Sequence, residues 1–220
     1  MKKNVERIYN LIEEHKTEQQ NVELVAVTKY VDSDTIRKLY DLGLRHFGEN
    51  RSNELLSKQE ELADINADLH WHFIGRLQRR PVKDFINKIA YLHSLDRESL
   101  MKEVNKRAEN PVKAFLQVNI SGEEQKAGFT PSKLLEVIQK MEIYPMIEVV
   151  GLMTMAPHDA NEDQLQTYFK NMKSLQKEIQ SLNLAYAPCN ELSMGMSNDF
   201  SIAVQEGATM IRVGNAIYKE

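Results

Sequence analysis

The sequence lacks the features that mark secreted, membrane-spanning or nucleic-acid-binding proteins. Its one cysteine, Cys189, cannot form a disulfide within the chain. No stretch approaches the roughly twenty consecutive apolar residues that a membrane-spanning helix needs. Charged residues such as Glu13, Glu14 and Lys16 interrupt the N-terminal segment, so it contains no apolar core of a secretory signal. The 28 basic and 32 acidic residues are spread along the chain, and their net charge of -4 leaves no extended basic face for nucleic acid or membrane.

These absences predict a soluble, cytoplasmic protein with a small-molecule partner, and we expect a monomer because no exposed apolar stripe stands out. Metal binding is not expected, since no His-x-His or Cys/His spacing occurs. The chain also has no internal repeat, low-complexity tract or long linker. With 42% hydrophobic residues, its 220 residues are enough for one large core, and we predict a single domain over residues 1–220.

Short apolar segments alternate with segments in which apolar residues recur at helical spacing. The N-terminal helix carries Val5, Ile8 and Ile12 on one side. We predict strands near residues 22–29, 45–49, 70–74, 90–95, 112–120, 147–153, 189–193 and 209–213. Besides the N-terminal helix and one that Ser33 caps and Gly43 ends, we predict helices near residues 50–63, 79–88, 96–109, 130–142, 161–182 and 198–206.

This alternation predicts a fold of the α/β class. Eight strand and helix units predict a parallel sheet that closes into a single (β/α)8 TIM barrel, with the N-terminal helix as an addition. A doubly wound open sheet is the alternative. In a barrel, functional groups lie at the C-terminal ends of the strands, and phosphate is held after the seventh and eighth strands. The polar motifs of this sequence fall at those positions.

Lys29 follows the apolar segment Leu24–Val27 and therefore leaves the first strand at its C-terminal end. A lysine that is partly removed from water loses its proton more readily and can attack an aldehyde to form a Schiff base. An isolated lysine at a strand end is more often a surface residue. The functional interpretation therefore depends on a phosphate motif elsewhere in the chain.

The C-terminal segment contains two turns suited to a phosphate group. Gly195 and Gly214 each lie between an expected strand and an expected helix, where the absence of a Cβ atom lets backbone N–H groups approach an anion. Ser197 is predicted as the N-cap of the helix near 198–206, with its hydroxyl available to the phosphate. Each residue could serve only a turn or a cap. Two such turns after the seventh and eighth strands favour phosphate binding.

Arg212 lies two residues before Gly214 and can point from the last strand toward a ring held by that phosphate. A guanidinium donates hydrogen bonds and accepts none, so it leaves a pyridine nitrogen unprotonated and weakens the ring as an electron sink. The alternative is a structural salt bridge on the strand. A lysine combined with a phosphate site is what pyridoxal 5'-phosphate (PLP) requires, and we predict PLP as the cofactor.

Other polar residues at the strand ends are less decisive. Asn50 is a candidate for contact with the ring hydroxyl, whereas Glu49 is expected only to pair with an arginine. His72 is expected to belong to the core or to support other site residues rather than to act in catalysis, and Cys189 is expected to pack as a small hydrophobe. A basic cluster is either a solvated helix start or an anion patch on the rim, and it contains Arg76, Arg79, Arg80 and Lys83.

Seven segments together closely resemble the pyridoxal phosphate homeostasis protein family: Ala26–Lys29, Phe47–Asn50, Trp71–Gly75, Gln117–Ile120, Glu123–Phe129, Gly151–Pro157 and Leu192–Ser197. The resemblance implies a barrel similar to the barrel domain of alanine racemase and a PLP carrier or regulator without established catalysis. It also implies PLP-dependent enzymes as candidate recipients of the cofactor. Residue by residue, it implies a Schiff base on Lys29, a cofactor contact at Asn50, phosphate contacts from Ser197, Gly214 and Asn215, and Arg212 at the pyridine nitrogen. Asn215 departs from the small hydroxyl residue usual in that family, but its backbone N–H can still donate.

Two functions from different classes remain open at this point. The first is a binding protein that buffers PLP or hands it to enzymes, with no catalytic residue. The second is an amino-acid racemase, which needs a second base on the face opposite the lysine. In alanine racemase that base comes from a separate domain, for which the sequence up to Glu220 leaves no room. Tyr30 is the nearest candidate, but neighbouring strand residues face opposite sides. We therefore expect the carrier.

Overall fold

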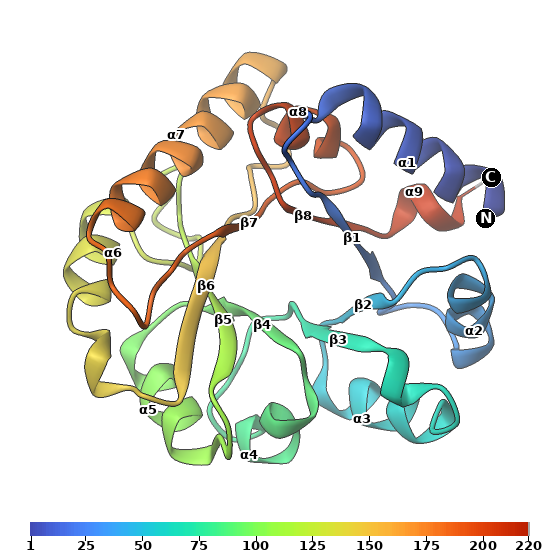
Figure 1. Cartoon of the computed structure of the whole chain (residues 1–220), viewed down its shortest axis with the longest axis horizontal. Coiled ribbons are helices and arrows are strands. Elements are labelled where there is room, and N and C mark those ends of the chain that lie inside the picture. The colour runs from blue at the N-terminus through green and yellow to red at the C-terminus, as the bar shows by residue number, and fades with distance from the viewer. Residues whose placement is uncertain (220) are drawn as a thin grey trace.

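The structure of the chain, a computed structural model, describes residues 1–219 as a closed barrel of eight parallel strands surrounded by helices (Figure 1). Each strand pairs with the next along the chain, and β8 pairs with β1, which confirms the predicted TIM barrel and excludes the open sheet. The strands are β1 (Glu23–Val27), β2 (His46–Glu49), β3 (His70–Phe73), β4 (Tyr91–Leu95), β5 (Val112–Gln117), β6 (Ile147–Met153), β7 (Glu191–Ser193) and β8 (Met210–Val213).

The helices lie outside the barrel and cover the strands, as Figure 1 shows. They are α1 (Lys2–His15), α2 (Ser33–Asp41), α3 (Ser52–Glu61), α4 (Val82–Phe85), α5 (Glu98–Arg107), α6 (Pro131–Ile138), α7 (Glu162–Ser181), α8 (Phe200–Gln205) and α9 (Asn215–Tyr218). Short 3-10 turns are η1 (Asn66–Asp68), η2 (Ile86–Lys88) and η3 (Met141–Ile143). The additional helix α1 packs against α8 and α9, and its Asn4 side chain donates to the backbone O atoms of Ile217 (3.1 Å) and Lys219 (2.7 Å).

The helix expected near residues 79–88 is much shorter than predicted. It consists of the single turn α4, which continues into η2. Pro81 lies directly before α4, and a proline disfavours helical conformation in the residue that precedes it. The helix therefore cannot begin at Arg79 or Arg80.

The N-cap predicted for α2 is also wrong by one residue. Asp32 is the N-cap, and its Oδ1 accepts a hydrogen bond from the backbone N–H of Thr35 at 2.9 Å. Ser33 is the first helical residue, and its hydroxyl donates to Glu61 on the neighbouring helix α3 at 2.6 Å. The serine therefore joins two helices instead of capping one.

Apolar residues form one core between barrel and helices and another inside the barrel. The inner cluster contains Val25, Phe115, Val150, Met153 and Met210, each at most 8% exposed. Because side chains alternate along a strand, residues next to Val25 on β1 belong to the outer core instead. The inside of the barrel is thus packed with side chains, and a ligand has to bind at its end.

Three histidines share the barrel interior with the inner cluster. His72 and His93 are fully buried and stack on Tyr91 and Phe115, with ring centroids 4.7 and 4.4 Å apart. His46 contacts His72 from the neighbouring strand. Burial lowers the pKa of His46 to about 4 and the pKa values of His72 and His93 well below 6.5. All three rings are therefore neutral near pH 7, and the expectation that His72 belongs to the core is confirmed.

We expect the protein to lose stability as the pH falls from about 7.5 to about 5.5. In the unfolded chain these histidines have pKa values near 6.5, so the unfolded state binds more protons than the folded state in this range. The free energy of unfolding must then rise with pH, by about 1.4 kcal/mol per histidine over the interval. Burial raises the pKa values of Glu23 and Asp199, which opposes this trend in part.

Urea unfolding over this pH range measures the effect. In the variant His46→Gln the free energy of unfolding should depend less steeply on pH, because one titrating ring is removed. The variant His158→Gln is the matched control, since His158 is exposed and should leave the slope unchanged. A wild-type stability that stays constant from about pH 7.5 to about pH 5.5 would contradict the prediction.

Candidate functional site

The residues predicted to bind a ligand all lie at the C-terminal ends of neighbouring strands. They are Lys29 after β1, Asn50 after β2, Ser197 after β7, Arg212 within β8, and Gly214 and Asn215 after β8. β1 pairs with both β2 and β8, and β8 pairs with β7, so these strand ends are adjacent. The structure therefore gathers the predicted positions at one end of the barrel.

Ser197 accepts hydrogen bonds from two backbone N–H groups of the loop after β8. Its Oγ lies 3.3 Å from the backbone N of Gly214 and 3.3 Å from that of Ala216. Ser197 is not the N-cap of α8. That position belongs to Asp199, whose Oδ1 accepts from the backbone N–H of Met196 at 2.5 Å. A hydroxyl and two backbone donors thus converge, which is a donor set suited to a phosphate oxygen. Sequence reasoning missed Ala216, because a backbone donor leaves no side-chain signal.

Gly195 shapes the loop that carries Ser197. Its φ is +95°, a conformation that side chains disfavour, and a Cβ atom here would lie 2.7 Å from Cβ of Ala203 and 2.9 Å from Cα of Phe200. Its backbone O accepts a hydrogen bond from the backbone N–H of Arg212 at 3.0 Å. Gly195 therefore holds the loop close to both α8 and β8, which brings Ser197 to the end of β8.

Arg212 is a buried cation, and its side chain makes no salt bridge with any residue that the structure describes. One guanidinium nitrogen, Nη1, donates to Oγ of Ser193 at 2.5 Å, and the other, Nη2, donates to the backbone O of Thr154 at 2.8 Å. Burial lowers the pKa of Arg212 to about 10, with Asp199 acting in the opposite direction. The residue therefore stays charged at neutral pH and keeps N–H groups free for an acceptor. The alternative of a structural salt bridge finds no support.

A buried ion pair holds the backbone directly before Lys29. Oε1 of Glu49 accepts from Nζ of Lys58 at 2.7 Å and from the hydroxyl of Thr28 at 2.6 Å. Nζ of Lys58 also donates to the backbone O of Thr28 at 2.8 Å. The expectation that Glu49 pairs with an arginine is wrong, because α3 brings Lys58 against the end of β2. The cluster fixes the place where Lys29 leaves the barrel.

Lys29 itself is half-buried and lies in the turn after β1. Its Nζ is 5.0 Å from the centroid of the Tyr30 ring, and Tyr30 is 84% exposed. Both residues lie beyond the strand, so the alternation of side chains along a strand does not place them on opposite sides. The argument from strand alternation against Tyr30 as a second base is therefore wrong. The ring of Tyr30 is nevertheless exposed to solvent.

Asn50 is held in place by a close approach of two backbones. A Cβ atom on Gly75, which follows β3, would lie 2.1 Å from the backbone O of Asn50. Only a glycine permits this contact between the loops after β2 and β3. Gly75 is therefore required for the position of Asn50 at the barrel end.

We expect Gly75→Ala to destabilise the protein by about 3 kcal/mol or more, because the clash is with backbone and one loop must move. The variant Gly43→Ala is the comparison. Gly43 has a φ of +96° but open space around its Cβ position, so it tests backbone strain without a clash. Chemical denaturation measures both. If the Gly75→Ala variant is no less stable than the Gly43→Ala variant, the close approach of Gly75 to the backbone of Asn50 is contradicted.

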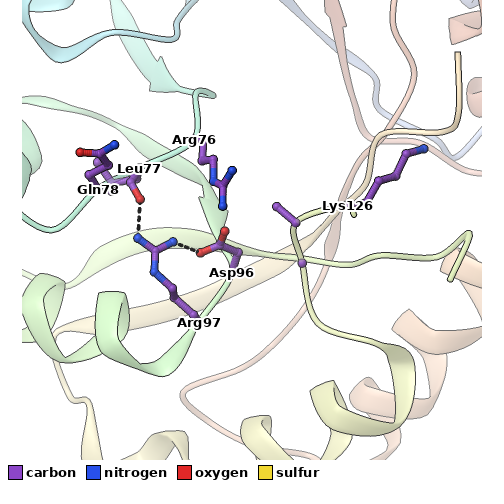
Figure 2. A pocket seen from close by; sticks show the side chains of 8 residues that line it. Arg76, Leu77, Gln78, Asp96, Arg97 and Lys126 are labelled. Atoms are coloured by element: carbon purple, nitrogen blue, oxygen red, sulfur yellow. Dashed lines mark hydrogen bonds and ion pairs between the residues drawn. The ribbon is translucent and has the colours of Figure 1, made fainter. Parts of the chain in front are cut away.

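A basic pocket of about 620 Å³ opens beyond the ends of β3, β4 and β5 (Figure 2). Arg76, Arg97 and Lys126 line it together with Asp96. Figure 2 shows Arg97 held between Asp96 and the backbone O of Leu77, to which it donates at 2.7 Å. Arg97 and Lys126 come from loops distant in sequence from Arg76, so sequence reasoning could not join them into one site.

The basic cluster predicted from the sequence is divided by the structure. Arg76 lines the pocket, whereas Arg79, Arg80 and Lys83 are absent from its described wall. Among residues 1–219, no group of three or more His, Cys, Asp or Glu side chains is arranged to hold a metal ion. No helix in the described part of the chain has the length and apolar character to span a membrane. Cys189 is buried, as expected, and burial raises the pKa of its thiol to about 12.

Sequence comparison finds relatives along the whole chain. The family described as alanine racemase, N-terminal domain, matches residues 1–220. The chain is 40% identical over 219 residues to the pyridoxal phosphate homeostasis protein of Aquifex aeolicus, which covers 98% of this chain and 94% of that protein. It is 36% identical over 204 residues to the protein of the same name from Schizosaccharomyces pombe, covering 90% and 84%.

Solved structures agree with these relatives. PipY of Synechococcus elongatus with PLP bound is similar with a TM-score of 0.86 at 32% identity, covering 98% of this chain and 99% of that one. Alanine racemase from Corynebacterium glutamicum is similar with a TM-score of 0.75 at 13% identity, covering 100% of this chain and 62% of that one. The second likeness shows a shared barrel fold.

Proposed function

Since this chain belongs to the alanine racemase N-terminal domain family, and within it to the pyridoxal phosphate homeostasis proteins, we propose that it binds PLP and serves PLP homeostasis. The observation that carries the proposal is the convergence of a buried, unpaired Arg212, the Ser197 donor set and Lys29 at one end of the barrel. A buried cation without a salt bridge is costly, and an anionic ligand compensates it.

The donor set fits the chemical groups of PLP. The cofactor supplies an aldehyde that condenses reversibly with an amine. Lys29 is the amine at this barrel end that we assign to that bond. Ser197 and the backbone N–H groups of Gly214, Asn215 and Ala216 would hold the phosphate, since two of them already converge on the Ser197 hydroxyl. Arg212 would donate to the ring nitrogen, and Asn50 would contact the ring or a nearby side chain.

We assign no catalytic residue and propose a carrier rather than a racemase. A racemase must move protons on both faces of its substrate and must keep water away from the reacting carbon. Tyr30 is close enough to Lys29 to be considered, but its 84% exposure places it in water rather than in a closed site. A carrier needs only reversible binding at an accessible position, and the exposure of Tyr30 next to Lys29 supports such access.

The recipients in this proposal are PLP-dependent enzymes that have lost their cofactor. We propose exchange in the cytoplasm, because a chain with one cysteine suits a reducing compartment. We also propose a monomer, for which size-exclusion chromatography with light scattering is the direct measurement.

The decisive experiment loads the purified protein with PLP and follows its absorbance before and after borohydride reduction. Peptide mapping then identifies the labelled residue. The loaded protein is next mixed with a cofactor-free PLP enzyme, and recovery of that enzyme's activity is compared with recovery by an equal amount of free PLP. We expect label on Lys29 and recovery from the loaded protein.

Two outcomes would overturn parts of the proposal. A protein that remains colourless with PLP would refute PLP binding. Stereospecific racemisation of alanine above the rate with free PLP, lost in Lys29→Ala, would replace the carrier by the enzyme.

A further inference from the structure

A chain of hydrogen bonds leads from Arg212 through the barrel interior to His46, whose ring faces the carboxylate of Glu23 at the opposite end. The hydrogen bonds join Arg212 to Ser193 (2.5 Å), Ser193 to His93 (2.8 Å), His93 to His72 (2.8 Å) and His72 to His46 (2.9 Å), and Nε2 of His46 lies 3.5 Å from Oε2 of Glu23. We call these six residues the interior relay. Its polar groups come from β8, β7, β4, β3, β2 and β1.

The interior relay joins a buried cation to a half-exposed anion. Arg212 is 4% exposed and pairs with Val25 in the register of β8 with β1. Glu23 is the first residue of β1, at the end of the barrel away from Lys29, and its side chain is 44% exposed. Between them, Ser193, His72 and His93 are completely removed from water. This polar path differs from the apolar inner cluster against which it packs through His93 and Phe115.

The chemistry of the two ends dictates the direction of every bond between them. A guanidinium can only donate and a carboxylate can only accept. A neutral imidazole has one donor and one acceptor nitrogen, and burial keeps the pKa values of His46, His72 and His93 low enough for all three to be neutral near pH 7. If Nε2 of His46 donates to Glu23, its Nδ1 must accept from Nε2 of His72, and the same step repeats at His93.

The opposite direction leaves groups unsatisfied. His93 would then donate from Nδ1 to Ser193, whose hydroxyl proton has no other acceptor among the described residues. Nε2 of His46 would present a lone pair to the carboxylate of Glu23. Buried groups without partners are costly, so one direction prevails.

We propose that Ser193, His93, His72, His46 and Glu23 are positioning residues for Arg212, with the three imidazoles all carrying their proton on Nε2. The relay and the backbone O of Thr154 occupy one N–H on each terminal nitrogen of Arg212. This fixes the plane of the guanidinium and directs its remaining donors. As a further step that rests on the proposed function, the relay sets how Arg212 meets the ring nitrogen of PLP.

The first test needs no cofactor. Nitrogen-15 NMR of the histidine rings in the PLP-free protein at pH 7 distinguishes the two tautomers, and single His→Gln variants assign the signals. We expect His46, His72 and His93 to carry the proton on Nε2. A proton on Nδ1 of His72 or His93 would overturn the relay.

The second test cuts the relay at Ser193 with Ser193→Ala. Its matched control is Ser94→Ala. Ser94 follows His93 on β4, is buried, and has a hydroxyl without a hydrogen-bond partner in the described structure. We expect Ser193→Ala to speed rotation and solvent exchange of the Arg212 side-chain N–H groups in the PLP-free protein. Ser94→Ala should leave them unchanged.

PLP titration separates this inference from the proposed function. We expect Ser193→Ala to weaken PLP binding about 5- to 10-fold and to shift the absorbance of the bound cofactor, with Ser94→Ala behaving as wild type. Unchanged Arg212 dynamics in Ser193→Ala would overturn the positioning role. A wild-type protein that fails to bind PLP while the tautomers and Arg212 dynamics are as expected would refute the proposed function and leave the relay standing.

Discussion

Replacing Lys29 by alanine is expected to abolish borohydride-stable labelling by PLP and to weaken PLP binding about 100-fold, or about 2.7 kcal/mol. The amine of Lys29 is the group we assign to the covalent bond. The phosphate contacts around Ser197 and the ring contact of Arg212 remain in the variant, so some reversible binding should survive. Lys29→Arg should behave in the same way, because a guanidinium stays protonated and is not a nucleophile at neutral pH.

Lys126→Ala is the matched control for this prediction. Lys126 lies at the same end of the barrel, in the basic pocket of Figure 2, but outside the donor set that we assign to PLP. Mass spectrometry after reduction and fluorescence titration should both show wild-type behaviour for this variant. Label that persists in Lys29→Ala and disappears in Lys126→Ala would move the covalent site to the other pocket.

The sequence was sufficient for the barrel and for the end at which the site lies. Eight strands were predicted because each is a short apolar segment followed by a helical pattern, and that periodicity is a local property. In a parallel barrel every strand ends on the same face, so Lys29 and Arg212 could be placed together although they lie at opposite ends of the chain. The strand ends themselves were less well predicted, since pairing, not composition, decides where a strand stops.

Contacts between elements could not be predicted in the same way. Ser197 looked like a helix cap, yet its hydroxyl accepts from the loop after β8, which only barrel closure brings near. Glu49 pairs with Lys58 because α3 packs against the end of β2. The interior relay depends on strand tilt and register, which place histidines from three neighbouring strands in line. None of these arrangements has a signature in the linear pattern.

Replacing Lys58 by methionine is expected to lower the free energy of unfolding by about 3 to 5 kcal/mol. The methionine fills a similar volume, so packing is largely kept, but the carboxylate of Glu49 loses its counter-ion in a fully buried position. The second carboxylate oxygen of Glu49, Oε2, already lacks a hydrogen-bond partner in the described structure, so no other contact there compensates the loss of Lys58. Thr28 loses the donor to its backbone O, and PLP binding should weaken because Lys29 follows directly.

Chemical denaturation and PLP titration of a double-variant cycle test the origin of this loss. Glu49→Gln with Lys58→Met should recover much of the stability lost in Lys58→Met alone, since the uncompensated charge is then gone. Lys133→Met is the control, because the ion pair of Lys133 with Glu136 is exposed and its loss should not be measurable. Equal stabilities for Lys58→Met and the double variant would show that lost packing, rather than a stranded carboxylate, is the cause. In that event the buried pair would not be what holds the end of β1 in place for Lys29.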